Sequence, residues 1–259
     1  MTNQGIARRI IEFEYRYPKS FSNAEYTDYG VIYYDTGNPN SQIANRAFIS
    51  KYDADTDFDR IIKEIKAFYL SKNLTPRICS DLTPGQLDKI KDCLMNNGFT
   101  IAVENDQIFM IRTSECKIGA PYTLKIKRVE KGEDLSFIHE VTNKYPSWRV
   151  LKKAETKLNS PDYHYNIFAG YLDDIPVAMA TIEYSDGLGF IDEVETAAKH
   201  QGKGYARQLT KFLLEYHGKH HKNDLLYLYY FNPVAGRIYK EAGFTEFDWK
   251  FELWSAYLD

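Results

Sequence analysis

The chain has 259 residues, 44% of them hydrophobic and 27% charged, a composition that excludes disordered, collagen-like and low-complexity proteins. Its net charge of −3 provides no global basic field, so we expect neither nucleic acid nor a membrane as a partner. The first residues lack a signal-like apolar stretch, and no run approaches the ~18 apolar residues of a membrane span, which predicts a cytoplasmic protein.

The first half of the chain alternates strand-like and helical patterns. Residues 29–34 are rich in β-branched and aromatic side chains and predict a strand, whereas residues 58–70 repeat apolar side chains at helical spacing. Gly119 and Pro121 interrupt the pattern within residues 114–121, so we expect a linker there. It would divide the chain into domains at residues 1–118 and 119–259. Since a common domain has about 100–150 residues, the chain has room for two.

The second half continues the alternation and predicts an α/β (α+β) fold. Expected strands cover residues 123–129, 165–172, 175–184, 188–196 and 225–231, with two short strands between 244 and 254. Expected helices cover residues 134–144, 150–158, 204–220 and 233–241. Asp173 and Asp174 predict a hairpin turn between two of the strands.

A glycine-bearing loop between an expected strand and helix carries the strongest chemical signal. Gly202 and Gly204 allow unusual backbone torsions that turn successive N–H groups outward, and the helix N-terminus adds partial positive charge. Lys203 and Arg207 lie one turn apart and would add charge to the same anion. The string is neither a dinucleotide fingerprint nor a Walker loop, and a glycine pair alone is also compatible with a tight turn.

The surroundings of this loop resemble those of the GCN5-related N-acetyltransferases (GNAT family). Residues 201–206 (QGKGYA) match the family's acetyl-CoA loop, Gln/Arg-x-x-Gly-x-Gly/Ala. A second family element, an Asn followed by a helix that ends in Tyr-x-x-x-Gly-Phe, matches residues 232–244. The resemblance covers residues 122–258. It implies a mixed, mostly antiparallel central sheet flanked by helices, and a metal-free enzyme that uses acetyl-CoA as co-substrate.

The resemblance also implies how the cofactor lies. The strand 188–196 would splay from the strand 225–231, and pantetheine would pair with backbone groups in the gap, while the loop amides hold the pyrophosphate. The residues expected to bind the cofactor are Val194, Thr196, Gln201, Gly202, Lys203, Gly204, Tyr205, Ala206, Arg207 and Asn232. Asn232 is equally suited to cap the helix that begins at Pro233, and both roles are compatible.

Tyr239 matches the family's general acid. A tyrosine has an ordinary pKa of about 10, above the value of about 8.5 for a simple thiol, so it can protonate a departing thiolate at small cost. The alternative is a tyrosine that packs at a helix–strand junction.

The base is less clearly marked, because many family members place a Glu where this chain has Tyr227. The neighbouring strand offers Glu193 and Glu195, which share one face by strand alternation and are the carboxylates we expect to accept the proton of the amine. A solvated strand face is the alternative.

The three histidines His217, His220 and His221 lie at a helix end. Their spacing offers no ligand geometry without distant partners, so we expect helix-terminal cations rather than a metal site. No G-x-S-x-G or H-E-x-x-H string is present, so the sequence does not favour a hydrolase.

The two halves share a Gly-Phe-Thr string, at residues 98–100 and 243–245, an offset of 243 − 98 = 145 residues. The same offset aligns the helix at 59–70 with that at 204–215, which favours two tandem domains over an unrelated cap. At this offset Tyr239 aligns with Leu94, and the loop 201–206 aligns with residues 56–61, which lack glycine and contain two acids. We therefore expect a degenerate N-terminal copy without a CoA site.

Taken together, the sequence predicts an acetyl-CoA-dependent N-acetyltransferase. It would transfer acetyl directly to a primary amine of a small molecule or protein in a ternary complex, as a monomer or homodimer. A non-catalytic acyl-CoA sensor or docking module is the alternative. Transfer to aminoacyl or peptide amines is less favoured, because no tRNA or peptidoglycan site is marked.

Overall fold

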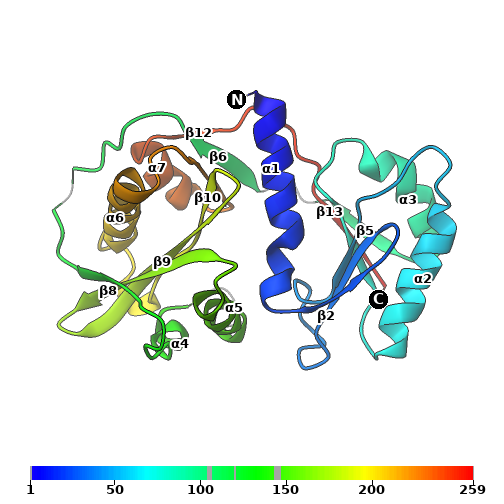
Figure 1. Cartoon of the computed structure of the whole chain (residues 1–259), viewed down its shortest axis with the longest axis horizontal. Coiled ribbons are helices and arrows are strands. Elements are labelled where there is room, and N and C mark those ends of the chain that lie inside the picture. Colours follow the sequence, from blue (N-terminus) through cyan, green and yellow to red (C-terminus); the bar gives the residue numbers. More distant parts are fainter. Residues whose placement is uncertain (1, 104–106, 120, 143–146, 259) are drawn as a thin grey trace. The chain divides into compact units, whose positions relative to one another are not determined.

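The computed structural model describes residues 2–103, 107–119, 121–142 and 147–258, and the chain divides into two compact units. The N-terminal unit comprises Met1–Asp106 and Asp248–Asp259, and the C-terminal unit comprises Gln107–Phe247. In each unit, helices cover a central sheet (Figure 1). The predicted α/β class, with two tandem domains, is confirmed.

The N-terminal unit is a six-stranded sheet in the order β1-β2-β3-β4-β13-β5. Only the β3–β4 pair is parallel. Helices α2 and α3 pack on one face of the sheet, where Ile65 and Ile90 join the main core, and Tyr15 of α1 packs on Phe48 on the other face. Its elements are α1 (Asn3–Arg16), β1 (Asn23–Tyr26), β2 (Gly30–Tyr34), β3 (Arg46–Ile49), α2 (Phe58–Ser71), β4 (Arg77–Cys79), α3 (Gln86–Asn96), β5 (Thr100–Val103) and β13 (Trp254–Tyr257).

The C-terminal unit is a seven-stranded sheet in the order β12-β6-β11-β10-β9-β8-β7, in which only β10 and β11 are parallel. Helices α6 and α7 pack with Ile182 on one face, whereas α4 and α5 pack with Ile167 on the other. Its elements are β6 (Ile108–Arg112), β7 (Lys125–Arg128), α4 (Phe137–Val141), α5 (Ser147–Asn159), β8 (His164–Leu172), β9 (Ile175–Ser185), β10 (Leu188–Thr196), α6 (Tyr205–His220), β11 (Leu225–Tyr230), α7 (Pro233–Glu241) and β12 (Phe244–Glu246).

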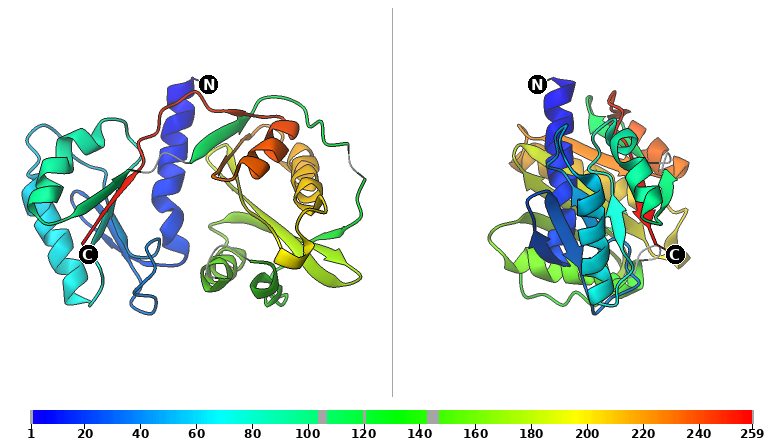
Figure 2. Two further views of the ribbon diagram at one scale, coloured as in Figure 1. Left: turned by 180° about the vertical axis from the view of Figure 1, so that it is seen from behind. Right: turned by 90° about the vertical axis from the view of Figure 1, so that its right-hand side faces the viewer.

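The two sheets exchange one strand each. Strand β6 follows the N-terminal unit in sequence but pairs with β11 and β12 of the C-terminal sheet. Strand β13 ends the chain but lies between β4 and β5 of the N-terminal sheet, as the red strand in Figure 2 shows. The predicted division at residues 118 and 119 differs from these units, because hydrogen bonding assigns β6 to the second sheet and β13 to the first.

The predicted linker at residues 114–121 is also placed differently. Its described residues lie inside the C-terminal unit, between β6 and β7, and Ala120 lies outside the described residues. Lys117 N–H donates to the carbonyl of Glu241, and the carbonyl of Gly243 accepts from Ser114 N–H. These bonds tie the segment to the end of α7, so it is a packed connection rather than a linker.

The internal repeat extends through the whole chain. Apart from β7 at its edge, the second sheet repeats the strand order of the first, with β8, β9, β10, β11, β6 and β12 in the places of β1, β2, β3, β4, β13 and β5. Gly98 and Gly243 follow α3 and α7 and share a left-handed backbone, with φ of 86° and 90°. This conformation favours glycine, which explains why both copies keep it.

Most of the predicted C-terminal elements are present within a few residues of their expected ends. Asp173 and Asp174 have φ of 49° and 65°, as a tight hairpin turn requires. Helix α4 is shorter than the predicted 134–144, whose last two residues lie outside the described part. The last predicted strand pairs in the first sheet instead of the second. Within the described ranges, no helix has the length and apolar character to cross a membrane.

Candidate functional site

Two parallel strands diverge in the middle of the C-terminal sheet. In the part of the chain that the structure describes, pairing of β10 with β11 ends at Phe190 and Tyr227. Beyond this point β10 continues to Thr196 beside β9, and β11 continues to Tyr230 beside β6. The family resemblance implies such a divergence of these two strands.

The free edge of β10 carries the backbone groups expected to bind pantetheine. Ala197 N–H donates to Val177 of β9, so strand alternation directs the backbone groups of Val194 and Thr196 toward the opposite edge, on the β11 side. Gln201 Nε2 donates to the carbonyl of Thr196 at 3.2 Å and holds the following loop against the strand end.

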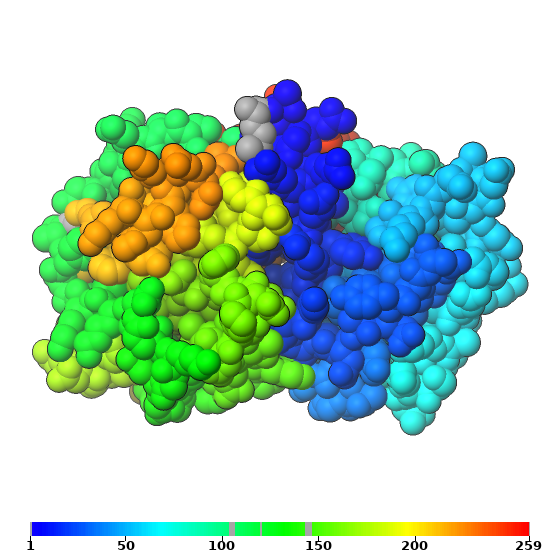
Figure 3. All heavy atoms as spheres, viewed as in Figure 1, coloured from blue at the N-terminus to red at the C-terminus, as the bar shows by residue number. Residues whose placement is uncertain are grey.

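The loop and the start of α6 form the cradle that the sequence predicts to bind an anion. Gly202 and Gly204 have φ of 78° and 81°, and a Cβ at either position would meet no described atom within 4 Å. Gly204 is the N-cap of α6 and has no side chain that could accept hydrogen bonds from the first turn. A helix N-terminus without a side-chain cap, next to a loop with space at both glycines, suits a phosphate. Figure 3 shows α6 and the segment after it, in gold and orange, at the surface of this unit.

The first turn of α6 is anchored rather than loose. Tyr205 is buried in the core, and Ala206 packs against the same cluster. Arg207 makes two bonds to the carboxylate of Glu241 in α7, at 2.8 and 2.9 Å. Glu241 partly neutralises the charge of Arg207. Of the two cations expected to bind the anion, Lys203 is therefore the more available one. The ion pair also ties α6 to α7.

The second family element forms α7. Asn232 is its N-cap, with Oδ1 accepting from Val234 N–H at 2.9 Å, and Pro233 begins the helix. Tyr239 is buried, with its ring centroid 6.5 Å from that of Tyr230 and 6.3 Å from that of Phe244. The structure thus shows the capping and packing roles of these two residues.

The acidic strand contains a β-bulge. The register between β10 and β9 shifts between Asp192 and Glu195, and Glu193 has a left-handed φ of 52°. Lys153 of α5 binds the two adjacent acids at this bulge. Its Nζ lies 2.8 Å from Asp192 Oδ2 and 2.7 Å from Glu193 Oε1. Val194 packs on the opposite face, toward α6 and α7. Glu193 and Glu195 therefore lie on the α5 side of the strand.

The two acids that share Lys153 titrate differently. Burial raises the pKa of Glu193 despite the nearby Lys153 charge. Burial also opposes ionisation of Asp192, but the attraction and hydrogen bond of Lys153 outweigh it and lower the pKa of that carboxyl. The Glu193 side chain is 1% exposed, whereas Glu195 is half-buried. Glu195 is therefore the more accessible of the two expected bases.

Tyr227 occupies the position where many family members carry a Glu. It is fully buried, and its ring stacks on that of Phe190 with centroids 4.8 Å apart. These two residues are the last pair in the register of β10 and β11. An apolar ring contact thus replaces a carboxylate at this point.

The histidines at the end of α6 do not gather around a metal. Within the described ranges, no group of three or more potential ligands is arranged for an ion. His217 is buried beside Tyr184, and burial lowers its pKa to about 4. The expectation of a helix-terminal cation is therefore wrong for His217, because the neutral imidazole is the favoured form at neutral pH.

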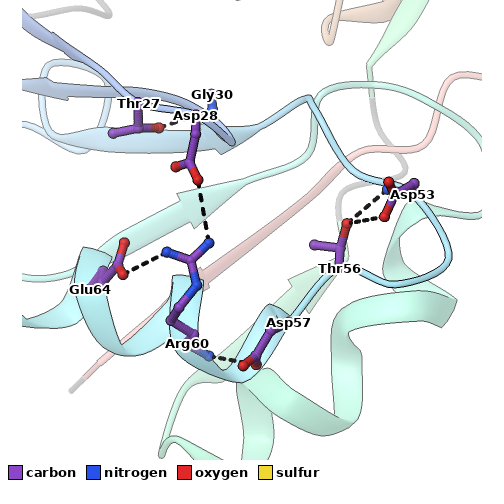
Figure 4. Close-up of polar contacts among 8 residues, drawn as sticks. All are labelled: Thr27, Asp28, Gly30, Asp53, Thr56, Asp57, Arg60 and Glu64. Atoms are coloured by element: carbon purple, nitrogen blue, oxygen red, sulfur yellow. Dashed lines mark hydrogen bonds and ion pairs between the residues drawn. The ribbon is translucent and has the colours of Figure 1, made fainter.

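The N-terminal unit differs where the C-terminal unit has its cradle. Helix α2 begins after Asp57, whose carboxylate accepts from Arg60 N–H at 3.0 Å (Figure 4). Arg60 in turn pairs with Glu64 and Asp28, and Asp53 accepts from the hydroxyl of Thr56. The first turn of this helix thus donates an N–H group to an acidic side chain of its own segment.

The N-terminus of helix α3 in that unit also has a carboxylate as its hydrogen-bond acceptor. Glu252 accepts from Gln86 N–H at 2.8 Å and from Leu87 N–H at 3.3 Å at the start of α3. The side chain of Gln86 bridges the ends of β3 and β4, donating to the carbonyl of Ile49 and accepting from Asp81 N–H. This is the place in the first sheet that corresponds to the divergent strands of the second.

Comparison with known proteins agrees with this geometry. The model of the acetyltransferase (GNAT) family matches residues 134–244. The C-terminal unit is a GNAT domain. Strands β8 to β12 and helices α4 to α7 all overlap the matched range, so it includes the cradle and the bulge. No curated protein matches the chain.

Solved structures extend the likeness to the whole chain. A GCN5-related N-acetyltransferase from Kribbella flavida has a TM-score of 0.66 at 15% identity, over 97% of this chain and 95% of its own. A functionally unknown conserved protein from Staphylococcus epidermidis has a TM-score of 0.57 at 14% identity, over 92% and 93%. A tandem GNAT protein from the clavulanic acid biosynthesis pathway has a TM-score of 0.58 at 10% identity, over 82% and 75%. At such identities the likeness concerns the fold.

Sequence reasoning missed Lys153 and the closing residues of the N-terminal unit. A signal for the first was present, because Arg149, Lys153 and Lys157 repeat every four residues on the apolar face of α5, and all three are buried. Charged residues on an apolar helix face require buried partners. For Gln86 and Glu252 no such signal existed, since 166 residues separate them.

Proposed function

We propose that the protein is an acetyl-CoA-dependent N-acetyltransferase acting on a primary amine of a small molecule or protein. The observation that carries the proposal is the cradle at the end of the divergent strands, with left-handed Gly202 and Gly204 and, among the described residues, no side-chain cap and no first-turn acid at the start of α6. The open space around both glycine Cα atoms fits the close approach of a pyrophosphate. Bound acetyl-CoA would supply the activated acetyl group.

Each expected residue has a physical task in this proposal. The amides of residues 202–206 and Lys203 bind the pyrophosphate, and the β11-side edge of β10, at Val194 and the N–H of Thr196, orients the pantetheine arm. Glu195, half-buried beside the bulge, accepts the proton of the amine directly or through water, with Glu193 as the second carboxylate. Tyr239 donates a proton to the departing thiolate. Direct transfer in a ternary complex needs no covalent intermediate on the protein.

The acceptor is proposed from charge alone. Lys153 binds Asp192 and Glu193, and the half-buried Glu195 follows them on the strand that would orient the acetyl arm. Negative charge close to the reacting centre attracts a cationic amine. We therefore propose an amine that carries a further positive charge.

We also propose that the N-terminal unit is a degenerate copy that binds no CoA. Carboxylates of Asp57 and Glu252 hold the N–H groups that a phosphate would need, and Gln86 bridges the strand ends. A phosphate at either helix would face these charges and lose the backbone donors.

Calorimetric titration with acetyl-CoA tests the binding step. Wild type should bind, and Gly204→Glu should lower the affinity at least about 100-fold, because it places a carboxylate in the cradle and an L-residue at positive φ. Gly218→Glu adds the same charge near the other end of α6 and is the matched control, with affinity unchanged. Absence of binding to wild type would overturn the proposal.

A thiol-release assay over a panel of amines tests catalysis. The panel should include a monoamine, a diamine and a lysine-containing peptide, and the dicationic diamine should give the highest kcat/KM. Binding of acetyl-CoA with only slow hydrolysis across such a panel would instead favour a non-catalytic sensor module.

A further inference from the structure

A single buried ammonium joins two consecutive carboxylates in the C-terminal unit. Lys153 Nζ lies 2.8 Å from Asp192 Oδ2 and 2.7 Å from Glu193 Oε1, and its side chain is 2% exposed. The three residues come from α5 and β10, which are far apart in sequence. A charge removed from water in this way requires partners, and Lys153 has both acids as partners.

The two acids flank a strained point of the backbone. Glu193 has φ of 52°, a left-handed conformation that costs free energy for a residue with a Cβ. Asp192 Oδ1 accepts from Glu193 N–H at 2.8 Å, and Thr181 Oγ1 donates to the carbonyl of Asp192 at 3.0 Å. Lys153 completes this set by holding the side chains on both sides of the strained φ angle. Such a conformation persists only where its surroundings hold it.

The bulge lies where its shape matters for the proposed chemistry. Pairing with β11 ends at Phe190, and the backbone that would meet the acetyl arm begins at Val194. An extra residue between them resets the alternation of the strand, so it determines which backbone groups face the free edge and which face carries Glu195.

A second buried pair on the same helix provides contrast. Lys157, one turn after Lys153, forms an ion pair with Glu183 of β9. Glu183 lies in an uninterrupted part of the β9 pairing, opposite Phe190 and Tyr165. The buried lysine of α5 that bridges two adjacent residues is therefore the one at the bulge.

The N-terminal copy lacks the same device. At the offset of 145 residues, Lys153 aligns with Arg8, which is exposed and pairs with Glu12 on its own helix. Asp192 and Glu193 align with Ala47 and Phe48, and the pairing of β3 with β2 shows no shift of register. The clamp and the bulge are present together in one copy and absent together from the described part of the other.

We propose that Lys153 is a positioning residue that clamps Asp192 and Glu193 and thereby holds the bulge in the shape that aims the free edge of β10 at the acetyl group. The inference rests on the proposed acetyl transfer. Lys153 itself touches neither substrate, and its effect passes through the backbone of residues 192–194.

The test compares Lys153→Met with Lys157→Met, which removes a buried ammonium of the same helix away from the bulge. Both variants should lower the unfolding midpoint. Only Lys153→Met should lower kcat, by at least about 10-fold, since small misplacements of reacting groups have effects of this size. Its dissociation constant for acetyl-CoA should stay within about threefold of wild type, because the cradle is intact.

Asp192→Asn keeps the size of the side chain and half of the clamp, and it carries the test should Lys153→Met fail to fold. We expect a smaller fall in kcat. The backbone amide resonance of Val194 reports the bulge without any activity, and it should move in Lys153→Met and Asp192→Asn but not in Lys157→Met.

Two results would overturn the clamp. One is an unchanged kcat and Val194 resonance in both Lys153→Met and Asp192→Asn, and the other is an equal change of both readouts in Lys157→Met. If wild type transfers no acetyl group, the proposed function fails, but the Val194 resonance still decides whether Lys153 holds the bulge.

Discussion

The two halves of this chain build the same sheet but begin the corresponding helices in opposite ways. Helix α6 begins after Gly204, which has no side chain to accept from the first N–H groups, whereas α2 begins after Asp57, whose carboxylate accepts from Arg60 N–H. Helix α7 is capped by the neutral Asn232, whereas the N–H groups at the start of α3 bind the carboxylate of Glu252. The fold alone therefore does not make a phosphate site.

We infer that a few side chains decide whether a copy of this fold can bind an anion, since the two copies share a strand order and differ at their helix N-termini. An acid at a helix N-terminus satisfies the same donors, and responds to the same dipole, as a phosphate would. The closed copy gains stability from these caps, and the open copy leaves donors for a ligand.

Tyr239 and its counterpart Leu94 should differ most. Tyr239→Phe removes the proposed proton donor, and we expect kcat to fall about 100-fold while the affinity for acetyl-CoA changes little. Leu94→Met, a volume-conserving change in the N-terminal core, should leave kcat unchanged. Stopped-flow thiol release and calorimetry separate the two quantities. A loss of affinity without a loss of rate would contradict the role of Tyr239.

His217 should make the free energy of unfolding depend on pH. Its folded pKa of about 4 is below the ordinary histidine pKa of 6.5, so the unfolded chain binds the extra proton and stability is lost as the pH falls between these values. Replacing His217 by Gln should remove about 2 kcal/mol of the loss between pH 7 and pH 5.

Urea unfolding at the two pH values measures this effect. His220→Gln is the matched control, because this residue is exposed near the end of the same helix, and the loss should persist in it. An unchanged pH dependence in His217→Gln would show that the imidazole is not buried in its neutral form. In the N-terminal copy, His217 aligns with Lys72. The ammonium of Lys72 lies over the rings of Tyr34 and Phe68, so the two copies differ at this position.

Glu252 should matter for stability and not for acetyl-CoA. Glu252→Ala leaves the N–H groups of Gln86 and Leu87 without their acceptor, which should cost about 1–2 kcal/mol of unfolding free energy. Glu246→Ala, an exposed acid whose partner is Lys240, should cost far less. Weaker acetyl-CoA binding in Glu252→Ala would argue that the N-terminal copy takes part in the site.

Asp57 should show the smallest effect. Asp57→Ala removes the cap of α2 and should cost about 1 kcal/mol in a urea titration. Asp55→Ala alters an exposed acid just before this helix and should change stability by less. If Asp57→Ala created a second acetyl-CoA site, the carboxylate alone would be what closes the copy.

The features that the sequence predicted well are local ones. Each depends on residues that are neighbours in the chain, so the residue types alone predict the local conformation. Examples are the loop at 201–206, the cap at Asn232 and the turn at Asp173–Asp174. The Gly-Phe-Thr repeat carried the tandem arrangement for a similar reason, because glycine is required after both helices.

The features that the sequence did not predict depend on distant partners. The pattern of β6 and β13 indicates strands, but nothing in it states that each pairs in the other copy's sheet. Lys153 meets its acids across 39 residues, and its burial is a property of packing. The strand alternation that assigned Glu193 and Glu195 to one face contains no sign of the bulge between Asp192 and Glu195.

We propose that one copy binds acetyl-CoA and the other does not, and native mass spectrometry counts the bound ligands directly. Wild type at saturating acetyl-CoA should carry one ligand for each chain, and Gly204→Glu should carry none. Two ligands for each wild-type chain, or one ligand retained in Gly204→Glu, would contradict the account.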